Sequence, residues 1–384
     1  MSGPLAGVTV LDLTRVLSGP YCTMMLADLG ARVIKVEHPG KGDDTRHWGP
    51  PFVGGESAYF LSVNRNKESV SVDFKQPGGR EVLERLLARA DVLVENFKPG
   101  TLDRAGFGWD AVHARHPRLV YASISGYGQT GPRRDEPGYD AVIQAEGGLM
   151  SITGDAGGSP FRLGVAISDI VAGMFAAQGV TAALYARAGT GEGQRIDIGM
   201  LDTTAALLTY QAGNYFATGE VPQRIGNRHP TIVPYETFPT ADGEMVLAVG
   251  NDGIWQRFCA AIERPDLAAD ARFATNRDRR AHYAELRPGL EAALRTRIAG
   301  GVDRPLPRRG HPVRGRARHR GGAGGPADRR ARHDRGPRPS DGRPHPRHGR
   351  ADQASPPPGC GAHRRRRSAS TRPTSCSNWA TISG

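Results

Sequence analysis

Short apolar runs alternate with amphipathic segments along the first 130 residues of the chain. The apolar runs predict strands at residues 8–13, 33–37, 69–74, 91–95 and 119–125, and the amphipathic segments predict helices at 20–29 and 79–89. Strands that alternate with helices at this spacing are typical of a parallel sheet covered on both faces. The predicted fold class is therefore α/β.

The pattern becomes helical between residues 138 and 220. Two helices, both expected to be buried, and an intervening strand are predicted at 170–187, 201–216 and 195–198. A connection rich in Gly, Pro and Asn then leads to a smaller α+β unit, with a strand at 245–249 and helices at 254–262 and 283–294. We therefore expect a large domain of residues 1–220 and a small domain of residues 221–300.

The composition changes abruptly after residue 300. Residues 301–384 contain 20 Arg and no Lys against five Asp and no Glu, together with 13 Gly and 12 Pro. The preceding 300 residues contain 31 basic and 34 acidic side chains, so the net charge of +12 belongs to this C-terminal tail. A segment with so few apolar residues cannot offset its ordering entropy, and we expect the tail to be disordered.

Cysteine usage and hydropathy suggest the cellular compartment. Cys22, Cys259, Cys360 and Cys376 lie far apart with no CxxC pair, which predicts neither a disulfide framework nor a metal site. No uninterrupted apolar run reaches the roughly 18 to 20 residues of a membrane span, and no signal peptide precedes the first strand. A cytoplasmic protein without a membrane partner is expected.

The turn after the first predicted strand bears on the ligand, because doubly wound sheets bind ligands at the carboxyl ends of their strands. This turn reads TRVLSGPYC and contains neither GxGxxG nor a Walker lysine motif. The absence of both motifs argues against a dinucleotide-dependent dehydrogenase and against a P-loop enzyme.

Nine segments between residues 5 and 299 resemble the class III CoA-transferases, the family of formyl-CoA and carnitine CoA-transferases, with α-methylacyl-CoA racemase as a close branch. They are VLDLTRVLSGP, ADLGARVIKVEHPGKGDDTR, NRNKESVSVDFK, ENFKPGTLDRAGFG, ISGYGQTGP, PGYDAVIQAEGGLMSITG, GVAISDIVAGMFAAQG, GEGQRIDIGMLDT and VGNDGIWQRFC. Each is weak alone, but their order and spacing together are specific.

The resemblance implies a covalent relay through Asp169. In the family, an aspartate at this position attacks the donor acyl-CoA, forms a mixed anhydride and then an aspartyl-CoA thioester. From the residues alone, Asp169 or Ser168 is more simply a cap of the helix predicted to begin at residue 170, and the resemblance reverses this preference. The two interpretations are compatible, because a helix N-terminus keeps a carboxylate ionised and its N–H groups can hold a developing oxyanion.

Other residues match family positions that bind CoA or surround the substrate. The resemblance implies CoA contacts at Asn96, Phe97, Lys98, Arg104, Lys75 and His38, where many members have Arg in place of His38. Taken alone, Lys75 and Arg104 are ordinary surface charges. Likewise it implies a substrate pocket with Trp48, Tyr59, Tyr139 and the glycines of the GNDG segment, Gly250 and Gly253. Taken alone, the aromatic residues are more often core.

Tyr139 separates two reactions within the family. Racemases of the close branch carry His at this position, where it forms an acid/base pair with the aspartate, whereas this chain reads Gly138-Tyr139-Asp140. A neutral phenol is a poor general base at neutral pH, which favours CoA transfer and leaves racemisation as the alternative. The sequence does not identify the donor or acceptor acid.

The resemblance further implies a Rossmann-like large domain, CoA thioesters as substrates in place of a permanently bound cofactor, and an interlocked homodimer that the C-terminal segment completes. Residues 301–384 depart from the family pattern. One interpretation is an arginine-rich arm that binds nucleic acid, although it lacks interleaved aromatics. The other is a slipped coding frame, because a shifted frame over residues 375–380 permits the family-like ending ELLELG. We favour the second, so a nucleic-acid partner is not expected.

Overall fold

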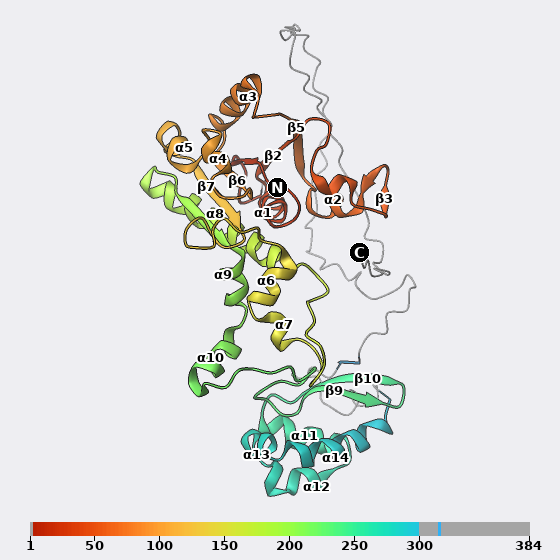
Figure 1. The fold of residues 1–384 in the computed structure, drawn as a ribbon. Coiled ribbons are helices and arrows are strands. Elements are labelled where there is room, and N and C mark those ends of the chain that lie inside the picture. Colours follow the sequence, from red (N-terminus) through yellow and green to blue (C-terminus); the bar gives the residue numbers. More distant parts are fainter. Residues whose placement is uncertain (1–2, 299–313, 316–384) are drawn as a thin grey trace, which may run out of the picture. The chain divides into compact units, whose positions relative to one another are not determined.

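We describe the fold from a computed structural model, in which residues 3–298 and 314–315 are described (Figure 1). The strands of the first 200 residues are β1 (Thr9–Asp12), β2 (Arg32–Glu37), β3 (Phe52–Val53), β4 (Glu56–Ser57), β5 (Lys67–Ser71), β6 (Val92–Glu95), β7 (Val120–Ser125) and β8 (Arg195–Gly199). The helices up to residue 218 are α1 (Ser18–Asp28), η1 (Asp44–His47), α2 (Ala58–Val63), α3 (Pro77–Leu87), α4 (Thr101–Arg104), α5 (Trp109–Arg115), α6 (Asp140–Glu146), α7 (Leu149–Ile152), α8 (Ile167–Thr190), α9 (Met200–Ala206) and α10 (Thr209–Thr218).

Six strands form one parallel sheet in the order β5-β2-β1-β6-β7-β8. Counted by their appearance in the chain, these strands lie in the order 3-2-1-4-5-6, which is the order of a doubly wound sheet. The predicted α/β class with a parallel sheet is confirmed. The parallel strands β1 and β6 pair directly, and successive strands are added on one side of this pair up to β5 and on the other side from β6 to β8. A ligand crevice is expected at this switch point.

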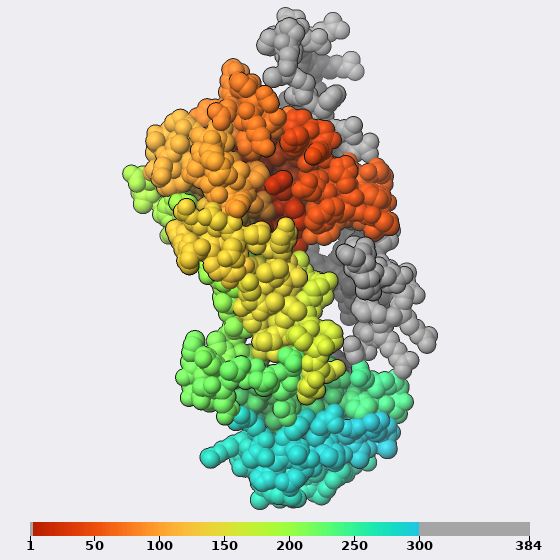
Figure 2. All heavy atoms as spheres, viewed as in Figure 1, coloured from red at the N-terminus to blue at the C-terminus, as the bar shows by residue number. Residues whose placement is uncertain are grey.

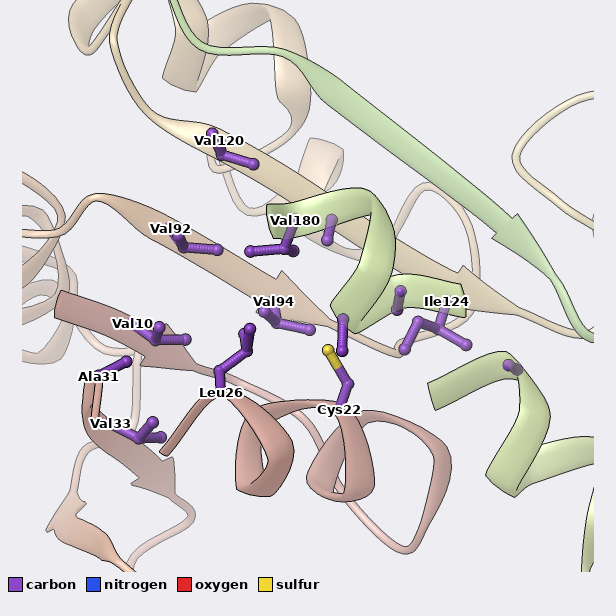
Figure 3. Close-up of a cluster of buried hydrophobic side chains, with 14 of the residues drawn as sticks. Val10, Cys22, Leu26, Ala31, Val33, Val92, Val94, Val120, Ile124 and Val180 are labelled. Carbon is purple, nitrogen blue, oxygen red and sulfur yellow. The ribbon is translucent and has the colours of Figure 1, made fainter. Parts of the chain in front are cut away.

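Both faces of the sheet are covered, as the continuous apolar runs of the strands predict. On one face, Val10, Val92 and Val94 meet Cys22 and Leu26 of α1 and Val180 of α8 (Figure 3). The opposite face takes the alternate strand residues, Leu11 and Leu93 among them, and packs against α3 and α5. Helices α1 and α8 therefore share one face, and their amino-terminal ends lie near the carboxyl edge of the sheet.

The chain continues into a smaller α+β unit with its own core. Its elements are β9 (Tyr235–Thr240), β10 (Gly243–Ala248), α11 (Asp252–Ala261), α12 (Pro265–Ala269), η2 (Ala271–Phe273), α13 (Asn276–Ala281), α14 (Tyr283–Arg295) and β11 (Arg314–Gly315). Buried Trp255 and Phe238 belong to its apolar cluster. The buried Arg279 guanidinium donates to the Val233 carbonyl at 2.8 Å and to Asp252 at 2.9 Å, so its charge is satisfied. Strand β11 pairs with β10; otherwise the predicted tail of residues 301–384 lies outside the described residues.

Two predictions about the helical region are wrong. The helix expected at 201–216 is interrupted between α9 and α10, where Thr209 has φ +36°. The expected burial is also wrong for α10, which has no buried residue, whereas α8 buries one face and exposes Met174, Phe175 and Tyr185. The segment that contains α10 is green in Figure 2 and lies at the surface. Apolar spacing reports an amphipathic helix but not whether a partner covers its apolar side.

Helix α8 also passes a membrane-span test. Within the described residues it is the one helix long and apolar enough to cross a membrane by length and composition. A core helix of a soluble protein passes the same test, and α8 packs on the sheet through its buried face.

Candidate active site

The loops after β1 and β6 are joined at the switch point by one side chain. Asn96 accepts a hydrogen bond from the Arg15 N–H at 2.8 Å and donates its amide to the Arg15 carbonyl at 2.7 Å. The same amide lies 3.4 Å from the Ser18 hydroxyl oxygen. The Asn96 amide thus pairs with both backbone groups of Arg15, as a neighbouring strand would, and holds the loop that leads from β1 into α1 in one conformation.

A buried ion pair between Lys35 and Asp43 holds the same loop through hydrogen bonds to its backbone. Lys35 Nζ lies 2.9 Å from an Asp43 carboxylate oxygen and donates to the Thr14 carbonyl at 2.7 Å. Asp43 in turn accepts the Val16 N–H at 3.3 Å. Val16 has φ +67°, a left-handed conformation that is strained for a β-branched residue. Strain of this kind persists only where surrounding contacts hold it, and it is concentrated at functional sites.

A cavity of about 190 Å³ opens at the carboxyl edge beside this loop. It is lined by the end of β2 and by residues that follow β1, β2, β5 and β6, namely Leu13, Thr14, Arg15, Lys35, Val36, Glu37, His38, Gly42, Asp43, Val72, Asp73, Phe74, Lys75, Phe97 and Thr101. The Arg15 guanidinium lies 5.2 Å from the centre of the Phe97 ring, which meets Phe74 edge to face. The cavity thus combines aromatic surface, which can stack on a ligand ring, with three basic side chains (Arg15, Lys35, Lys75) and three acidic ones (Glu37, Asp43, Asp73).

Three of the six predicted CoA residues line this cavity, and a fourth adjoins it. His38, Lys75 and Phe97 are lining residues, and Asn96 precedes Phe97. Lys98 lines a second, water-sized polar pocket, in which burial raises the pKa of Glu95 to about 7. Arg104 is exposed in α4, with its guanidinium 3.4 Å from the Thr101 hydroxyl. The structure therefore brings together His38, Lys75, Asn96 and Phe97, whereas Lys98 and Arg104 lie outside this cavity lining.

Asp169 lies where the amino-terminal ends of α1 and α8 meet. Helix α8 begins at Ile167 with Ala166 as its N-cap, so Asp169 occupies the third helical position, and the predicted cap role of Asp169 or Ser168 is wrong. Ser18, the first residue of α1, donates its N–H and its hydroxyl to the Asp169 carboxylate. A Cβ on Gly173 would lie 2.5 Å from the Ser18 carbonyl oxygen, so this glycine allows the two helices to approach.

The environment of Asp169 raises its pKa. Burial and the nearby Asp140 carboxylate raise the pKa of Asp169 to about 6, against the lowering effect of the Ser18 hydrogen bonds. Desolvation and the repulsion from Asp140 therefore outweigh the hydrogen bonds and the helix N-terminus, which favour the ionised form. The group is still mostly ionised at neutral pH, and it is more basic than an ordinary aspartate.

Aromatic side chains gather beside Asp169. The Tyr59 phenol faces Asp169, Asp140 and Asp43, and burial together with these carboxylates raises its pKa to about 12, so it remains a neutral hydrogen-bond donor. Trp48, which is 46% exposed, meets Tyr59 edge to face with ring centres 5.2 Å apart. Tyr139 is 67% exposed just before α6, so neither Trp48 nor Tyr139 is the core residue of the alternative interpretation.

The two predicted pocket glycines lie in the smaller unit. Gly250 precedes Asn251, the N-cap of α11, and Gly253 lies inside the first turn of this helix. Neither lines the two cavities described above.

Sequence reasoning missed Ser18, Gly173 and the role of Asp140. Their contacts to the Asp169 turn depend on how α1, α6 and α8 pack, and only the GYD triplet pointed toward Asp140. Among the residues that the structure describes, no cluster of three or more His, Cys, Asp or Glu could hold a metal ion.

The fold and this site together define a doubly wound α/β protein with a carboxylate of raised pKa where two helix N-termini meet and a cavity at the carboxyl edge of its sheet. A family model described as CoA-transferase family III matches residues 5–315. The chain belongs to CoA-transferase family III, and it is a transferase.

Curated relatives agree with this assignment. The chain is 47% identical over 293 residues to acetyl-CoA:oxalate CoA-transferase of Acetobacter aceti, which covers 76% of this chain and 75% of that protein. It is 48% identical over 290 residues to succinate–glutarate CoA-transferase of Agrobacterium fabrum, with 74% and 72% covered. Human succinyl-CoA:glutarate CoA-transferase is 48% identical over 273 residues, and the match spans 71% of this chain but only 62% of the human protein.

Solved structures give the same picture. A CaiB/BaiF family protein from Brucella suis superimposes with a TM-score of 0.72 at 43% identity, covering 82% of this chain and 84% of that one. A hypothetical protein from Mycobacterium tuberculosis gives a TM-score of 0.70 at 37% identity, with 78% and 80% covered. These relatives support CoA transfer between an acyl-CoA and an acid.

Proposed function

We propose that this protein transfers CoA from an acyl-CoA to a small dicarboxylic acid, with Asp169 as the covalent nucleophile. The position of Asp169, half-buried where two helix N-termini meet and with a raised pKa, is the observation that carries the proposal. The preference for dicarboxylic acids comes from the relatives, whose names include oxalate, succinate, glutarate, citramalate and mesaconate.

The first half-reaction transfers CoA onto the enzyme. An Asp169 oxygen attacks the thioester carbonyl carbon, the C–S bond breaks, and a mixed anhydride and CoA thiolate form. The thiolate then attacks the Asp169 carbonyl carbon, which releases the donor acid as a carboxylate and leaves an aspartyl-CoA thioester. The acceptor carboxylate repeats these two steps in reverse order, and no net proton is consumed.

The residues around Asp169 have roles that follow from their contacts. The Ser18 N–H and hydroxyl orient the carboxylate and can hold negative charge on oxygen during the attack. The neutral Tyr59 phenol can donate a further hydrogen bond there. His38, Lys75 and Phe97 are assigned to the CoA nucleotide because they line the cavity at the carboxyl edge, and Asn96 is assigned with them because it precedes Phe97.

Asp169 is tested by covalent trapping. The enzyme is incubated with succinyl-CoA and then with hydroxylamine, and tryptic peptides are analysed by mass spectrometry. A hydroxamate on Asp169 that is lost in Asp169→Ala supports the proposal. Asp110→Ala is the matched control, because Asp110 is an exposed carboxylate in the first turn of α5. Glutaryl-CoA formation that survives in Asp169→Ala contradicts the proposed nucleophile.

Deuterium exchange separates CoA transfer from racemisation. Tyr139 supplies a phenol where racemases carry an imidazole, so the proton next to the thioester should not exchange. A branched acyl-CoA incubated in deuterated water should therefore gain no deuterium. Rapid exchange without CoA transfer to glutarate contradicts the proposed reaction.

The proposal includes a cytoplasmic location, a Rossmann-like large domain and a homodimer. The homodimer is supported by the exposed apolar surface of α8 and α10, where Met174, Phe175, Tyr215 and Phe216 are 47%, 40%, 44% and 80% exposed. Exposed apolar surface of this extent marks an interaction site. Light scattering of the purified protein should give twice the monomer mass, and the Phe216→Ser variant should give a lower mass because its dimer dissociates.

A further inference from the structure

Asp140 and Gln144 together bind the segment that enters α8. One Asp140 oxygen accepts the Ser168 N–H at 3.0 Å and the other accepts the Gln144 amide at 2.8 Å. Fully buried Gln144 accepts the Leu163 N–H at 2.8 Å, and its amide lies 3.3 Å from the Val165 carbonyl. Residues 163 to 168 are therefore fixed by one carboxylate–amide pair immediately before Asp169.

This arrangement places two carboxylates at one helix N-terminus. Asp140 is bound to the residue preceding Asp169, and its charge raises the pKa of that neighbour. The groups that face Asp169 are Asp140 before α6, Tyr59 on α2 and Ser18 on α1, while Asp43 faces the same phenol. A capping role alone needs an acceptor for the Ser168 N–H, which an uncharged side chain also provides.

We propose that Asp140 is a positioning residue whose negative charge favours the covalent states of Asp169, because acylation removes one of two neighbouring charges. This inference rests on the proposed function. In the anhydride, the charge has moved to the CoA thiolate, and in the thioester it has left with the donor carboxylate. Asp169 is neutral in both states, so the repulsion acts only on the free enzyme and is relieved when the new bond forms.

Two variants separate the charge of Asp140 from its hydrogen bonds. Asp140→Asn keeps an oxygen for the Ser168 N–H but loses both the charge and the acceptor for the Gln144 amide. Gln144→Met removes the amide contacts to residues 163 and 165 and keeps the charge. Asp140→Glu is the conservative rescue variant, since it restores the charge.

The experiment measures Asp169 modification by succinyl-CoA in quenched samples between pH 4.5 and 8, as a rate and as the equilibrium ratio of thioester to free enzyme. The wild type should lose its acylation rate below about pH 6. In Asp140→Asn this midpoint should fall by about one unit and the equilibrium ratio by about tenfold, because one pKa unit is a factor of ten. Gln144→Met should slow acylation without moving the midpoint. Asp140→Glu should have the midpoint and the equilibrium ratio of the wild type.

Failure of the Asp140 role and failure of Asp169 as the nucleophile give different results. A folded Asp140→Asn protein with the wild-type midpoint and ratio overturns the role of Asp140. If circular dichroism shows that this variant does not fold, Asp140→Ser is judged by the same two criteria, because its hydroxyl can also accept the Ser168 N–H. Absence of any label on Asp169 in the wild type instead overturns the proposed function.

Discussion

Two aspartates at the same edge of the sheet have opposite environments. Asp12, fully buried at the end of β1, lies 3.2 Å from Lys67 Nζ and accepts the Thr23 hydroxyl at 2.6 Å. Burial opposes its ionisation, but Lys67 and Lys35 hold its pKa below the ordinary value. Asp169 has hydrogen bonds from Ser18 and a second carboxylate beside it, and its pKa rises to about 6.

The difference shows how one residue type takes two roles. A buried carboxylate surrounded by cations and hydroxyls is satisfied, and it stabilises the loop after β1. A half-buried carboxylate beside another negative charge is less stable in its ionised form, which makes it a stronger nucleophile. Variants that change the surroundings of Asp12 or of Asp169 should therefore have different effects on stability and on acylation.

The largest effect is expected from breaking the Asp12 environment. Lys67 donates to Asp12, to the Pro20 carbonyl at 2.9 Å and to Asn64 at 2.9 Å. Lys67→Met leaves a buried carboxylate without its nearest cation, and should lower the free energy of unfolding by about 4 kcal/mol in urea titrations.

Arg32→Met is the control for this change. Arg32 pairs with Glu68 at 2.9 Å on the adjoining strands, but both side chains are about half exposed, at 55% and 46%. This variant should lose less than about 1 kcal/mol. Equal losses in the two variants would mean that burial of the Asp12 pair contributes nothing to its strength.

The next effect comes from separating α1 and α8. Gly173→Ala places a Cβ 2.5 Å from the Ser18 carbonyl oxygen, which is backbone and cannot rotate away. We expect a loss of about 2 to 3 kcal/mol in stability, together with at least tenfold slower acylation of Asp169, because Ser18 is displaced from the carboxylate.

A second glycine of the same helix provides the control. A Cβ on Gly189 meets no atom within 4 Å, so Gly189→Ala should stabilise the protein by up to about 1 kcal/mol and leave acylation unchanged. If Gly173→Ala behaves like Gly189→Ala, the close approach of the helices is not needed for the site.

The sequence predicted the sheet well because its strands are buried on both faces and alternate with helices. Periodicity could not predict the exposure of α10, since a helix with an apolar side looks the same whether or not a partner covers it. The position of Asp169 came from resemblance to a family. Its surroundings came only from the fold, because Ser18 and Asp140 are 151 and 29 residues away in the chain and approach it through helix packing.

A smaller effect, of opposite sign in the two aspartates, is expected from removing their charges. The native pKa of Asp169 is about 6, above the roughly 3.9 of an unfolded chain, so its charge destabilises the native state above pH 6. This penalty disappears as the pH falls toward 4, because the native state then binds the proton. Asp169→Asn should therefore raise the free energy of unfolding by about 2 kcal/mol at pH 7.5 and by almost nothing at pH 4.

Asp12→Asn should do the reverse at neutral pH. The native pKa of Asp12 lies below its unfolded value, so its charge stabilises the fold above about pH 4, and this contribution is lost as the pH falls further. Urea unfolding of both variants at the two pH values tests the pair. A destabilised Asp169→Asn protein at pH 7.5 contradicts the contrast between the two sites.

The smallest effect is expected from cations that lie outside both aspartate sites. Lys75 lines the cavity at the carboxyl edge, whereas Lys98 lines the separate polar pocket. If Lys75 binds a CoA phosphate as proposed, Lys75→Met should raise the KM for succinyl-CoA about fivefold with kcat unchanged, because an exposed ionic contact contributes about 1 kcal/mol. Lys98→Met should change KM less than twofold. The difference should shrink in 0.5 M NaCl, since exposed charges are screened. Equal effects of the two variants would place the CoA phosphates between the pockets and move the anion site away from the cavity.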